Sequence, residues 1–280
     1  MGALSLFNFF FLLGDEIIRD WDEARHGVSA YEMAVSGNYI VNTYNFQADY
    51  WNAKPPLSLW LTALGYEIFG FNTFALRFFS ALCSTVTVLI TVIFTGRKLS
   101  WAAAFIAGGV LLTLDSFIFE HNARSGDPDA IFILFSTGAI LGAILSRGRI
   151  WPVYASAFLL SLAFLTKSFH MLSPLLTVLI LLALNHGKKL FRLKVGVGFL
   201  LSALIPSLVW ALLRYSNDGL AFFHIMFGYD VIERSLKAVE GHTGSVFYYL
   251  KVLHHDFRQY YILIALLLLA LLFCRRRKLR

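Results

Sequence analysis

Two adjacent carboxylates, Asp22 and Glu23, stand beside Arg25 in the segment Trp-Asp-Glu-Ala-Arg-His at residues 21–26. Adjacent carboxylates repel each other, and at a membrane boundary they also lose hydration, so we expect a raised pKa for at least one. Such a carboxylate can remove a proton from a hydroxyl group. The simpler alternative is a solvated charged loop beside the end of a helix. The pair is therefore a candidate for general-base catalysis.

A lysine at a fixed position is the second candidate. Lys54 precedes Pro55 and Pro56, and an apolar segment follows them. Proline restricts the backbone, so the ammonium group should have a defined place, and a lysine so placed can hold a phosphate as a point charge. Two prolines are also an ordinary signal for the start of a helix.

The third candidate is the segment Arg-Ser-Gly-Asp-Pro-Asp at residues 124–129. Asp129 opens an apolar helix, where the positive end of the helix dipole favours a carboxylate, and Asp127 is placed to cap that helix before Pro128. Capping explains one aspartate. It does not explain a second one close to Arg124.

Four later residues complete the set: Lys167, Arg234, His242 and Tyr248. A lone lysine at a helix end such as Lys167 can simply extend to the membrane surface. The histidines are too scattered for metal-ligand spacing, so we assign no metal site and expect no required cofactor, and a divalent metal has no support from the sequence.

The elements that carry these residues belong to a membrane protein. Hydrophobic residues make up 58% of the 280-residue chain, against about 45–50% in soluble domains. Cys83 and Cys274 lie in or beside apolar runs, so neither a disulfide framework nor a thiolate metal site is expected. A span needs about 20 apolar residues, and about eight segments qualify. They lie near Gly2–Ile18, Thr73–Thr95, Trp101–Phe119, Ala130–Ser146, Trp151–Thr166, Met171–Asn185, Val195–Leu213 and Tyr260–Phe273.

The charges separate by side of the membrane. The loops after the second, fourth and sixth spans and the C-terminal tail hold 13 of the 24 basic residues and none of the 17 acidic ones. The positive-inside rule makes these loops cytoplasmic. The basic pI of 9.4 then reflects topology, and nucleic-acid binding is not needed to explain it. Residues 15–72, 120–129 and 214–259 become outer loops.

The first outer loop contains two segments with apolar residues at helical spacing, Ala24–Val35 and Leu57–Phe69. These are expected to be helices lying in the membrane interface. The fold class is therefore an all-α polytopic membrane protein, with interfacial helices in its first outer loop.

In their order along the chain, the motifs resemble those of glycosyltransferase family 39 and the aminoarabinose transferase group, which includes the protein O-mannosyltransferases. The resemblance rests on Asp-Glu-Ala-Arg at 22–25, Lys-Pro-Pro-Leu-x-x-Trp at 54–60, Arg-Ser-Gly-Asp-Pro-Asp at 124–129 and Thr-Lys-Ser at 166–168, followed by Arg234, His242 and Tyr248. It covers most of the chain, and its first 170 residues are the most specific part. It implies the GT-C membrane fold and a single transmembrane glycosyltransferase module over residues 1–280.

The resemblance also implies an activity: inverting transfer of a sugar from a polyprenyl-phosphate donor to a protein, lipid or glycan acceptor. The site would face the periplasm or exterior of a prokaryotic plasma membrane. Asp22 would be the main catalytic carboxylate, with Glu23 beside it and Asp129 as the second acid. The substrate-binding residues would be Arg25, Lys54, Arg124, Asp127, Lys167, Arg234, His242 and Tyr248.

Two departures from that group stand out. Family members usually continue well beyond 280 residues, so the C-terminal region that helps to choose an acceptor is expected to be absent. Ala53 also stands where the aminoarabinose transferases have a glutamate, which argues against a metal at that position.

Two other functions fit a chain with many spans: a lipid-sugar flippase or transporter, and a non-catalytic partner subunit. Transporters usually place ionisable residues near the bilayer midplane, on broken helices in two repeated halves. The expected spans are nearly free of charge and show no repeat, so the transferase is favoured.

Overall fold

The computed structural model describes residues 1–187, 193–228, 247–262 and 264–266, and they are mainly helical. The first half of the described chain contains α1 (Gly2–Phe10), α2 (Asp22–Ser36), the strands β1 (Thr43–Tyr44) and β2 (Gln47–Ala48), α3 (Leu57–Phe69), α4 (Thr73–Lys98), α5 (Trp101–Leu111) and α6 (Asp115–Ile118). The second half contains α7 (Asp129–Leu145), α8 (Trp151–Lys167), the 3-10 helix η1 (Ser168–Met171), α9 (Leu172–His186), α10 (Leu193–Asp218), α11 (Ala221–Phe227), α13 (Tyr248–Phe257) and η5 (Arg258–Tyr260).

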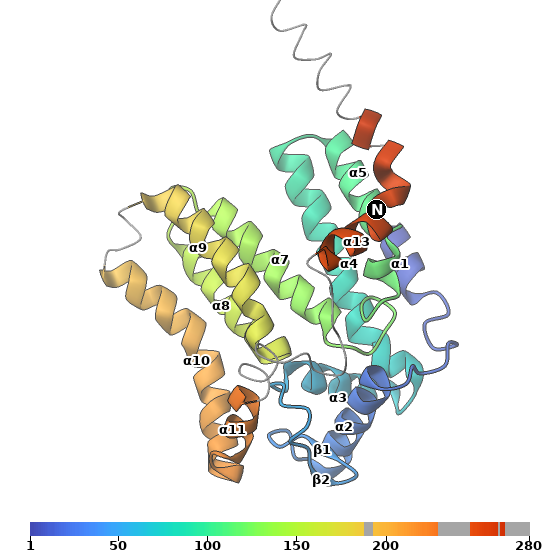
Figure 1. Ribbon diagram of the computed structural model, residues 1–280, viewed down its shortest axis with the longest axis vertical. Coiled ribbons are helices and arrows are strands. Elements are labelled where there is room, and N and C mark those ends of the chain that lie inside the picture. The colour runs from blue at the N-terminus through green and yellow to red at the C-terminus, as the bar shows by residue number, and fades with distance from the viewer. Residues whose placement is uncertain (188–192, 229–246, 263, 267–280) are drawn as a thin grey trace, which may run out of the picture.

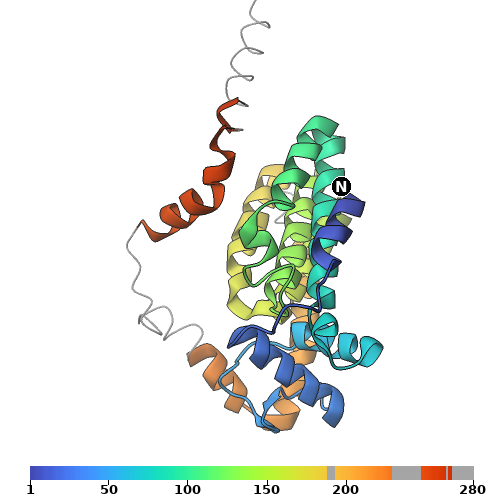
Figure 2. The ribbon, with the colours of Figure 1, turned by 90° about the vertical axis from the view of Figure 1, so that its right-hand side faces the viewer.

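The long helices form a bundle with different structures at its two ends. Helix α4 packs against α1, α5 and α7, while α7 packs against α8 and α9, and α8 against α10. The connections α4–α5 and α7–α8 lie at the upper end in Figure 1, and α2, α3 and the strands lie at the lower end. Figure 2 shows the same division from the side. Of the loops expected to be cytoplasmic, the described ones after α4 and α7 thus lie at the end of the bundle opposite the first outer loop.

Three helical stretches are long and apolar enough to cross a membrane: α4, the stretch Trp151–His186 that joins α8 to α9, and α10. Helices α3, α5 and α7 are apolar but shorter. A multi-span helical protein is therefore confirmed in outline, while the number of about eight spans stays a prediction. Most of the expected last span, Tyr260–Phe273, lies outside the described residues.

The first and third expected spans are shorter helices than the sequence suggested. Helix α1 ends at Phe10 instead of continuing to Ile18, because the Arg124 guanidinium donates to the carbonyls of Asn8, Phe11 and Leu12 at 3.2, 2.8 and 3.2 Å. These carbonyls would otherwise need partners in the next helical turn. The third segment breaks after Leu111, and the short helix α6 follows separately.

Small side chains allow the helices of the second half to approach closely. Ala139 and Ala143 on α7 are fully buried, and they share a core cluster with Val153 and Leu160 on α8. A Cβ atom added at Gly142 would lie 2.6 Å from Ser156 Oγ, which leaves no room for a larger residue. Close packing through small residues is typical of helices in membranes.

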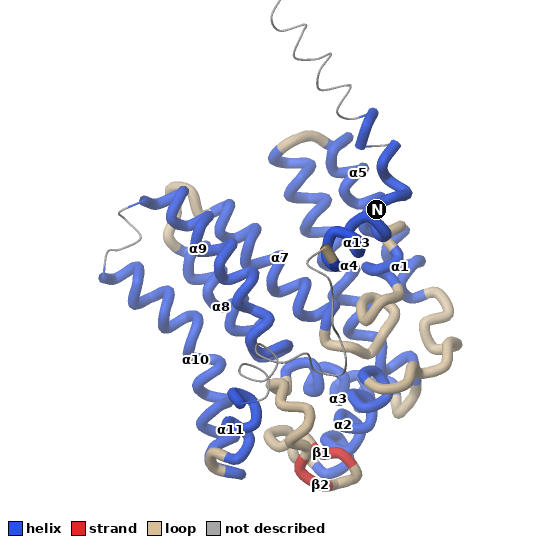
Figure 3. The backbone as a smooth tube through the Cα atoms, in the orientation of Figure 1, coloured by secondary structure: helices blue, strands red, loops and turns tan. Residues whose placement is uncertain are grey.

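The two helices expected in the first outer loop both form. Helix α2 includes all of Ala24–Val35, and α3 has the expected bounds of Leu57–Phe69. Between them a short antiparallel hairpin pairs Thr43 with Ala48 (Figure 3). Glu32 on α2 accepts hydrogen bonds from Thr43 Oγ1 and the Phe46 amide at 2.6 and 3.0 Å, which holds the hairpin against α2.

Candidate active site

The carboxylate of Glu23 is the centre of a buried structural network. Arg77 on α4 donates to it from Nε and Nη2 at 2.6 and 2.8 Å, and the backbone amides of Arg19 and Gly126 each donate at 2.8 Å. Arg77 also donates to the carbonyls of Leu13, Glu16 and Ile17. These bonds tie together the start of α2, the chain after α1, helix α4 and the loop before α7.

The pKa of Glu23 is lowered, so Glu23 is not a carboxylate of this pair with a raised pKa. Burial alone would raise it, but the hydrogen bonds from Arg77, Arg19 and Gly126 outweigh that effect. A carboxylate with four donors is a poor proton acceptor. We therefore assign Glu23 a positioning role in place of the catalytic role expected from the sequence.

Arg25 is also occupied by a partner from its own loop. Its guanidinium donates to both carboxylate oxygens of Asp49, at 3.2 and 2.8 Å, and stacks between the rings of Tyr44 and Trp51. Asp49 in turn accepts from the amides of Trp51 and Asn52. Arg25 thus orders the segment that leads to Lys54, and its expected role at the donor phosphate is not the one that these contacts support.

Arg124 has a structural role as well. Besides the carbonyls at the end of α1, it contacts Glu16 Oε1 at 3.0 Å, and its side chain is 9% exposed. These contacts hold the end of α1, and the expected role of Arg124 in substrate binding stays a prediction.

Lys54 differs from these arginines because no hydrogen-bond or ion-pair partner is recorded for it within the described ranges. It is half-buried, and Pro55 and Pro56 after it are buried. Its charge acts on two rings: after burial, it is the second cause that lowers the pKa of His26, to about 4, and it also acts on His170. Lys54 thus lies near both rings.

The second charged pair is Asp129 with Lys167. Lys167 Nζ lies 2.5 Å from Asp129 Oδ1, and both side chains are partly exposed. Asp129 opens α7 as expected, but its carboxylate is occupied by the lysine at the end of α8. The charges of Lys54, Asp129 and Lys167 all act on His170, so these groups share one neighbourhood.

Asp127 does not cap α7. Its Oδ2 accepts from Ser125 Oγ and lies 3.0 Å from His121 Nδ1, while no side-chain cap bonds the first turn of α7. Burial, the largest effect, raises the pKa of Asp127, and the charge of Asp22 adds to this. The expected capping role of Asp127 is therefore wrong.

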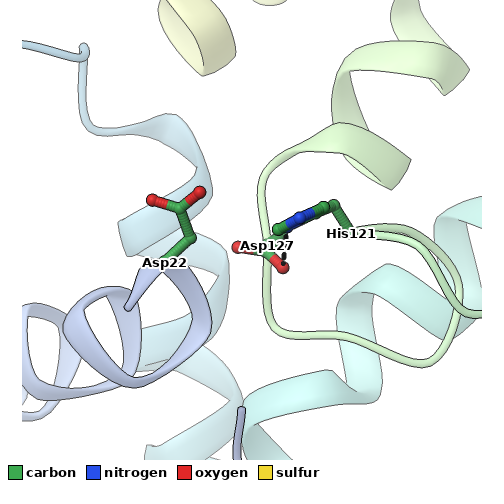
Figure 4. A group of neighbouring side chains, drawn as sticks. All are labelled: Asp22, His121 and Asp127. Carbon is green, nitrogen blue, oxygen red and sulfur yellow. Dashed lines mark hydrogen bonds and ion pairs between the residues drawn. The ribbon is translucent and has the colours of Figure 1, made fainter. Parts of the chain in front are cut away.

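Asp127 also belongs to a cluster of three side chains. One ligand atom each of Asp22, His121 and Asp127 lies within 4.8 Å of the others (Figure 4).

Asp22 begins α2 and is exposed, and no hydrogen bond or ion pair is recorded for its side chain in the described part of the chain. Trp21 before it has a left-handed backbone, with φ of 66°, and so has His121, with φ of 54°. A non-glycine residue adopts this conformation at a cost of about 1–2 kcal/mol. The surrounding contacts must hold both residues in place.

The remaining candidates lie in the late part of the chain. Arg234 and His242 fall outside the described residues. Tyr248 opens α13, and the turn after α13 is anchored to the end of α5 through the Tyr260 hydroxyl, 2.8 Å from Thr113 Oγ1. Whether these three residues join the site stays a prediction.

Two arginines that the sequence reading passed over organise the site. Arg77 and Arg214 are each 1% exposed. Arg214 donates from Nη1 to Asn42 Oδ1 at 2.8 Å and from Nε to Asp218 Oδ2 at 2.9 Å, which fixes the first outer loop against α10. A single arginine within or at the end of an apolar segment usually has a buried partner. The positions of Arg77 and Arg214 in such segments therefore indicate, from the sequence alone, that each has a buried partner.

Neither of the two cavities whose linings are described includes the candidate residues Asp22, Lys54 and Asp129. The larger has a volume of about 550 Å³ and an apolar lining from α2, α3 and the start of α4, including Val28 and Tyr66. The other, of about 360 Å³, lies beside α1. The linings of these two cavities therefore do not bring Asp22, Lys54 and Asp129 into one cavity.

The chain matches known proteins over most of its length. Residues 53–212 match the family described as dolichyl-phosphate-mannose-protein mannosyltransferase. The undecaprenyl phosphate-alpha-4-amino-4-deoxy-L-arabinose arabinosyl transferase of Edwardsiella ictaluri is 30% identical over 83% of this chain and 42% of its own length. The Proteus mirabilis protein described as arabinosyl transferase 2 of that type is 27% identical, over 90% of this chain and 47% of its own.

The fold is similar to that of a solved structure. ArnT from Cupriavidus metallidurans, in a crystal structure bound to undecaprenyl phosphate, matches with a TM-score of 0.74 and 21% identity. The match covers 92% of this chain and 48% of that one. This chain spans about half the length of the curated relatives that it matches.

Proposed function

Because this chain belongs to the dolichyl-phosphate-mannose-protein mannosyltransferase family and to its aminoarabinose transferase-like group, we propose that it is a membrane glycosyltransferase. The donor is a polyprenyl-phosphate sugar, and the acceptor is a lipid, glycan or protein. The site faces the outer side of a prokaryotic inner membrane, which is the side that the distribution of basic residues gives to the first outer loop.

The observation that carries this proposal is which charged side chains have an ion-pair or hydrogen-bond partner and which do not. Glu23, Arg25 and Arg124 are held by partners, while no partner is recorded for Asp22 and Lys54 among the described residues. The charges of Asp22 and Lys54 both act on His26, so the acid and the cation lie near the same ring. One carboxylate able to accept a proton and one cation able to hold a phosphate are the two groups that the transfer needs.

The chemistry follows from these two groups. The acceptor hydroxyl attacks the anomeric carbon on the side opposite the phosphate, the new glycosidic bond forms, and the bond to the phosphate oxygen breaks. Asp22 takes the proton of the hydroxyl. Lys54 stabilises the negative charge that develops on the departing polyprenyl phosphate. Attack from the opposite side inverts the anomeric configuration.

The pair of Asp129 and Lys167 supports the cationic side of the site. Lys167 is positioned by Asp129 and lies in the same neighbourhood as Lys54. We assign Lys167 to the donor phosphate and Asp129 to holding Lys167, which replaces the catalytic role first expected for Asp129. A second lysine close to the first adds to the stabilisation of a phosphate group.

A site at the end of a membrane bundle suits a donor with a long apolar tail. Each tail methylene that stays in lipid contributes about 0.8 kcal/mol, so extracting the donor into water would be very costly. Helices α2 and α3 place the site beside the ends of the long apolar helices (Figure 1).

The test is sugar transfer by purified protein in nanodiscs, with a polyprenyl-phosphate sugar as donor. Asp22→Asn keeps the shape of the side chain but cannot accept the proton. We expect its turnover to fall by about 100-fold or more, with donor affinity near that of the wild type. Asp20→Asn is the matched control, since it removes the same charge two residues away from an exposed position.

Two results would contradict the proposal in different ways. Full transfer activity in Asp22→Asn would remove the base from the mechanism. Normal donor binding by the wild type without any transfer would favour a carrier or a partner subunit instead of an enzyme.

A further inference from the structure

Asp22, His121 and Asp127 come from two separate parts of the chain and meet in front of the loop that leads to α7. One ligand atom from each lies within 4.8 Å of the other two. Figure 4 shows Asp22, at the start of α2, on one side of Asp127 and the His121 ring on the other side. Two carboxylates and an imidazole thus converge on a small volume.

The network around Glu23 is what brings the two parts together. Gly126, the residue before Asp127, donates its amide to Glu23 Oε1 at 2.8 Å, and Glu23 is the neighbour of Asp22. Because Glu23 is also held by Arg77 on α4, separating the two segments would break a hydrogen bond from Gly126 to a buried, fixed carboxylate. The backbone segments that carry Asp22 and Asp127 are therefore held together by bonds that the Asp22 and Asp127 side chains do not make.

Asp127 supplies an independent sign that a ligand belongs here. It is 3% exposed, and its Oδ1 is buried without a hydrogen-bond partner, while Oδ2 is occupied by Ser125 and His121. A buried carboxylate oxygen without a partner is costly. Two guanidinium groups of the surrounding segments are paired with other carboxylates, Arg77 with Glu23 and Arg124 with Glu16.

We propose that Asp22, His121 and Asp127 bind one divalent transition-metal cation. Two carboxylate oxygens and one imidazole nitrogen, with no thiolate, suit Mn²⁺ or Zn²⁺. Three protein ligands leave coordination positions open for water or substrate. The His121 side chain is 60% exposed, so the site can be reached from solvent.

The cation has a clear physical effect on each ligand. It supplies a partner for Oδ1 of Asp127 and lowers the repulsion between Asp127 and Asp22. Binding through one oxygen of Asp22 leaves the second oxygen of that carboxylate free. On the proposed function, the cation also fixes the orientation of the Asp22 carboxylate for the reaction, and this last role rests on that function.

Mn²⁺ binding to the full chain in nanodiscs of uncharged lipid tests the site. Free Mn²⁺ gives a strong electron paramagnetic resonance signal that disappears on binding, so a titration measures affinity directly. We expect one Mn²⁺ per chain, displaced by Zn²⁺, and an affinity reduced by about tenfold or more in His121→Gln and in Asp22→Asn. Asp20→Asn and His224→Gln, at exposed positions outside the site, should leave the affinity unchanged.

Pulsed measurements identify the ligand itself. Bound Mn²⁺ should show coupling to an imidazole nitrogen in the wild type and lose it in His121→Gln. His121 is exposed, so this variant is expected to fold even if the buried Asp127→Asn variant does not. Asp127→Asn, where it folds, should bind Mn²⁺ as weakly as His121→Gln does.

Failure to bind either Mn²⁺ or Zn²⁺, or binding that His121→Gln leaves unchanged, would overturn the proposal. If neither ion binds, the contact between His121 and Asp127 is only a hydrogen bond between two side chains. These readouts need no sugar transfer, so the metal site can fail while the transferase stands. Conversely, a chain that binds Mn²⁺ but never transfers sugar would refute only the proposed function.

Discussion

The Arg77 guanidinium meets both carboxylate oxygens of Glu23, from Nε at 2.6 Å and from Nη2 at 2.8 Å. The two side chains are 1% and 0% exposed, so the pair is fully shielded from water. It joins the middle of the candidate site to α4, one of the longest apolar helices of the described chain. The position of Asp22 therefore depends on a bond that its neighbour makes.

Breaking this pair should destabilise the protein. Glu23→Gln leaves the Arg77 charge buried without a counterion, and we expect a loss of about 3–5 kcal/mol. The measurement is thermal and denaturant unfolding in detergent, with the exposed Glu120→Gln as the control. The double variant Glu23→Leu, Arg77→Met should recover much of the loss, because it removes both charges. A Glu23→Gln protein as stable as the wild type, yet inactive, would return Glu23 to a catalytic role.

Lys54→Ala should affect donor binding and rate together. A cation that holds the phosphate acts on the bound donor and on the charge that develops during transfer, whereas a base acts only on the second. Lys98→Ala removes a lysine at the opposite end of the bundle and should change neither quantity. The measurement is donor affinity and single-turnover rate on the same nanodisc samples. Unchanged donor affinity in Lys54→Ala would place the phosphate elsewhere.

His26 should make the stability depend on pH. It is 6% exposed, and its pKa is lowered from 6.5 to about 4 by burial first and by the Lys54 charge second. Between those two values the unfolded chain binds more protons than the folded one, so stability falls as the pH drops from 6.5 toward 4, by about 3 kcal/mol in total.

The comparison with His26→Phe isolates this contribution. Asp127, with a raised pKa, acts in the opposite direction, and Glu23, with a lowered pKa, acts at lower pH, but both are present in the two proteins and cancel. We expect a shallower loss of stability in His26→Phe, measured by denaturant unfolding at several pH values. Identical pH profiles would show that His26 is not held neutral by its surroundings.

The orientation in the membrane can be tested by cysteine labelling. After Cys83 and Cys274 are replaced by serine, Asp22→Cys should react with a membrane-impermeant reagent from the outer side, and Arg97→Cys only from the cytoplasmic side. The loops with Arg147 and Lys188 should behave like Arg97, and His242 like Asp22. Labelling of Asp22→Cys from the cytoplasm alone would invert the whole assignment.

The sequence by itself determined the helices and their general surroundings. Helix α3 begins and ends at the expected residues, because helical spacing and the preceding prolines act over a few positions. The division of charge between alternate loops also follows from the sequence, and the described loops after α4 and α7 lie opposite the first outer loop, as that division predicts. These properties depend on near neighbours or on simple counts, and for that reason they can be read without a structure.

The tertiary structure decided which charges are free. Glu23 finds Arg77 over a separation of 54 residues, and Lys167 finds Asp129 over 38. Each pairs a carboxylate to which the resemblance had given a catalytic role. His121 gained a place beside Asp22 only because the loop before α7 folds back onto α2. Local patterns cannot specify such pairs, since the packing of distant helices selects the partner of each buried charge.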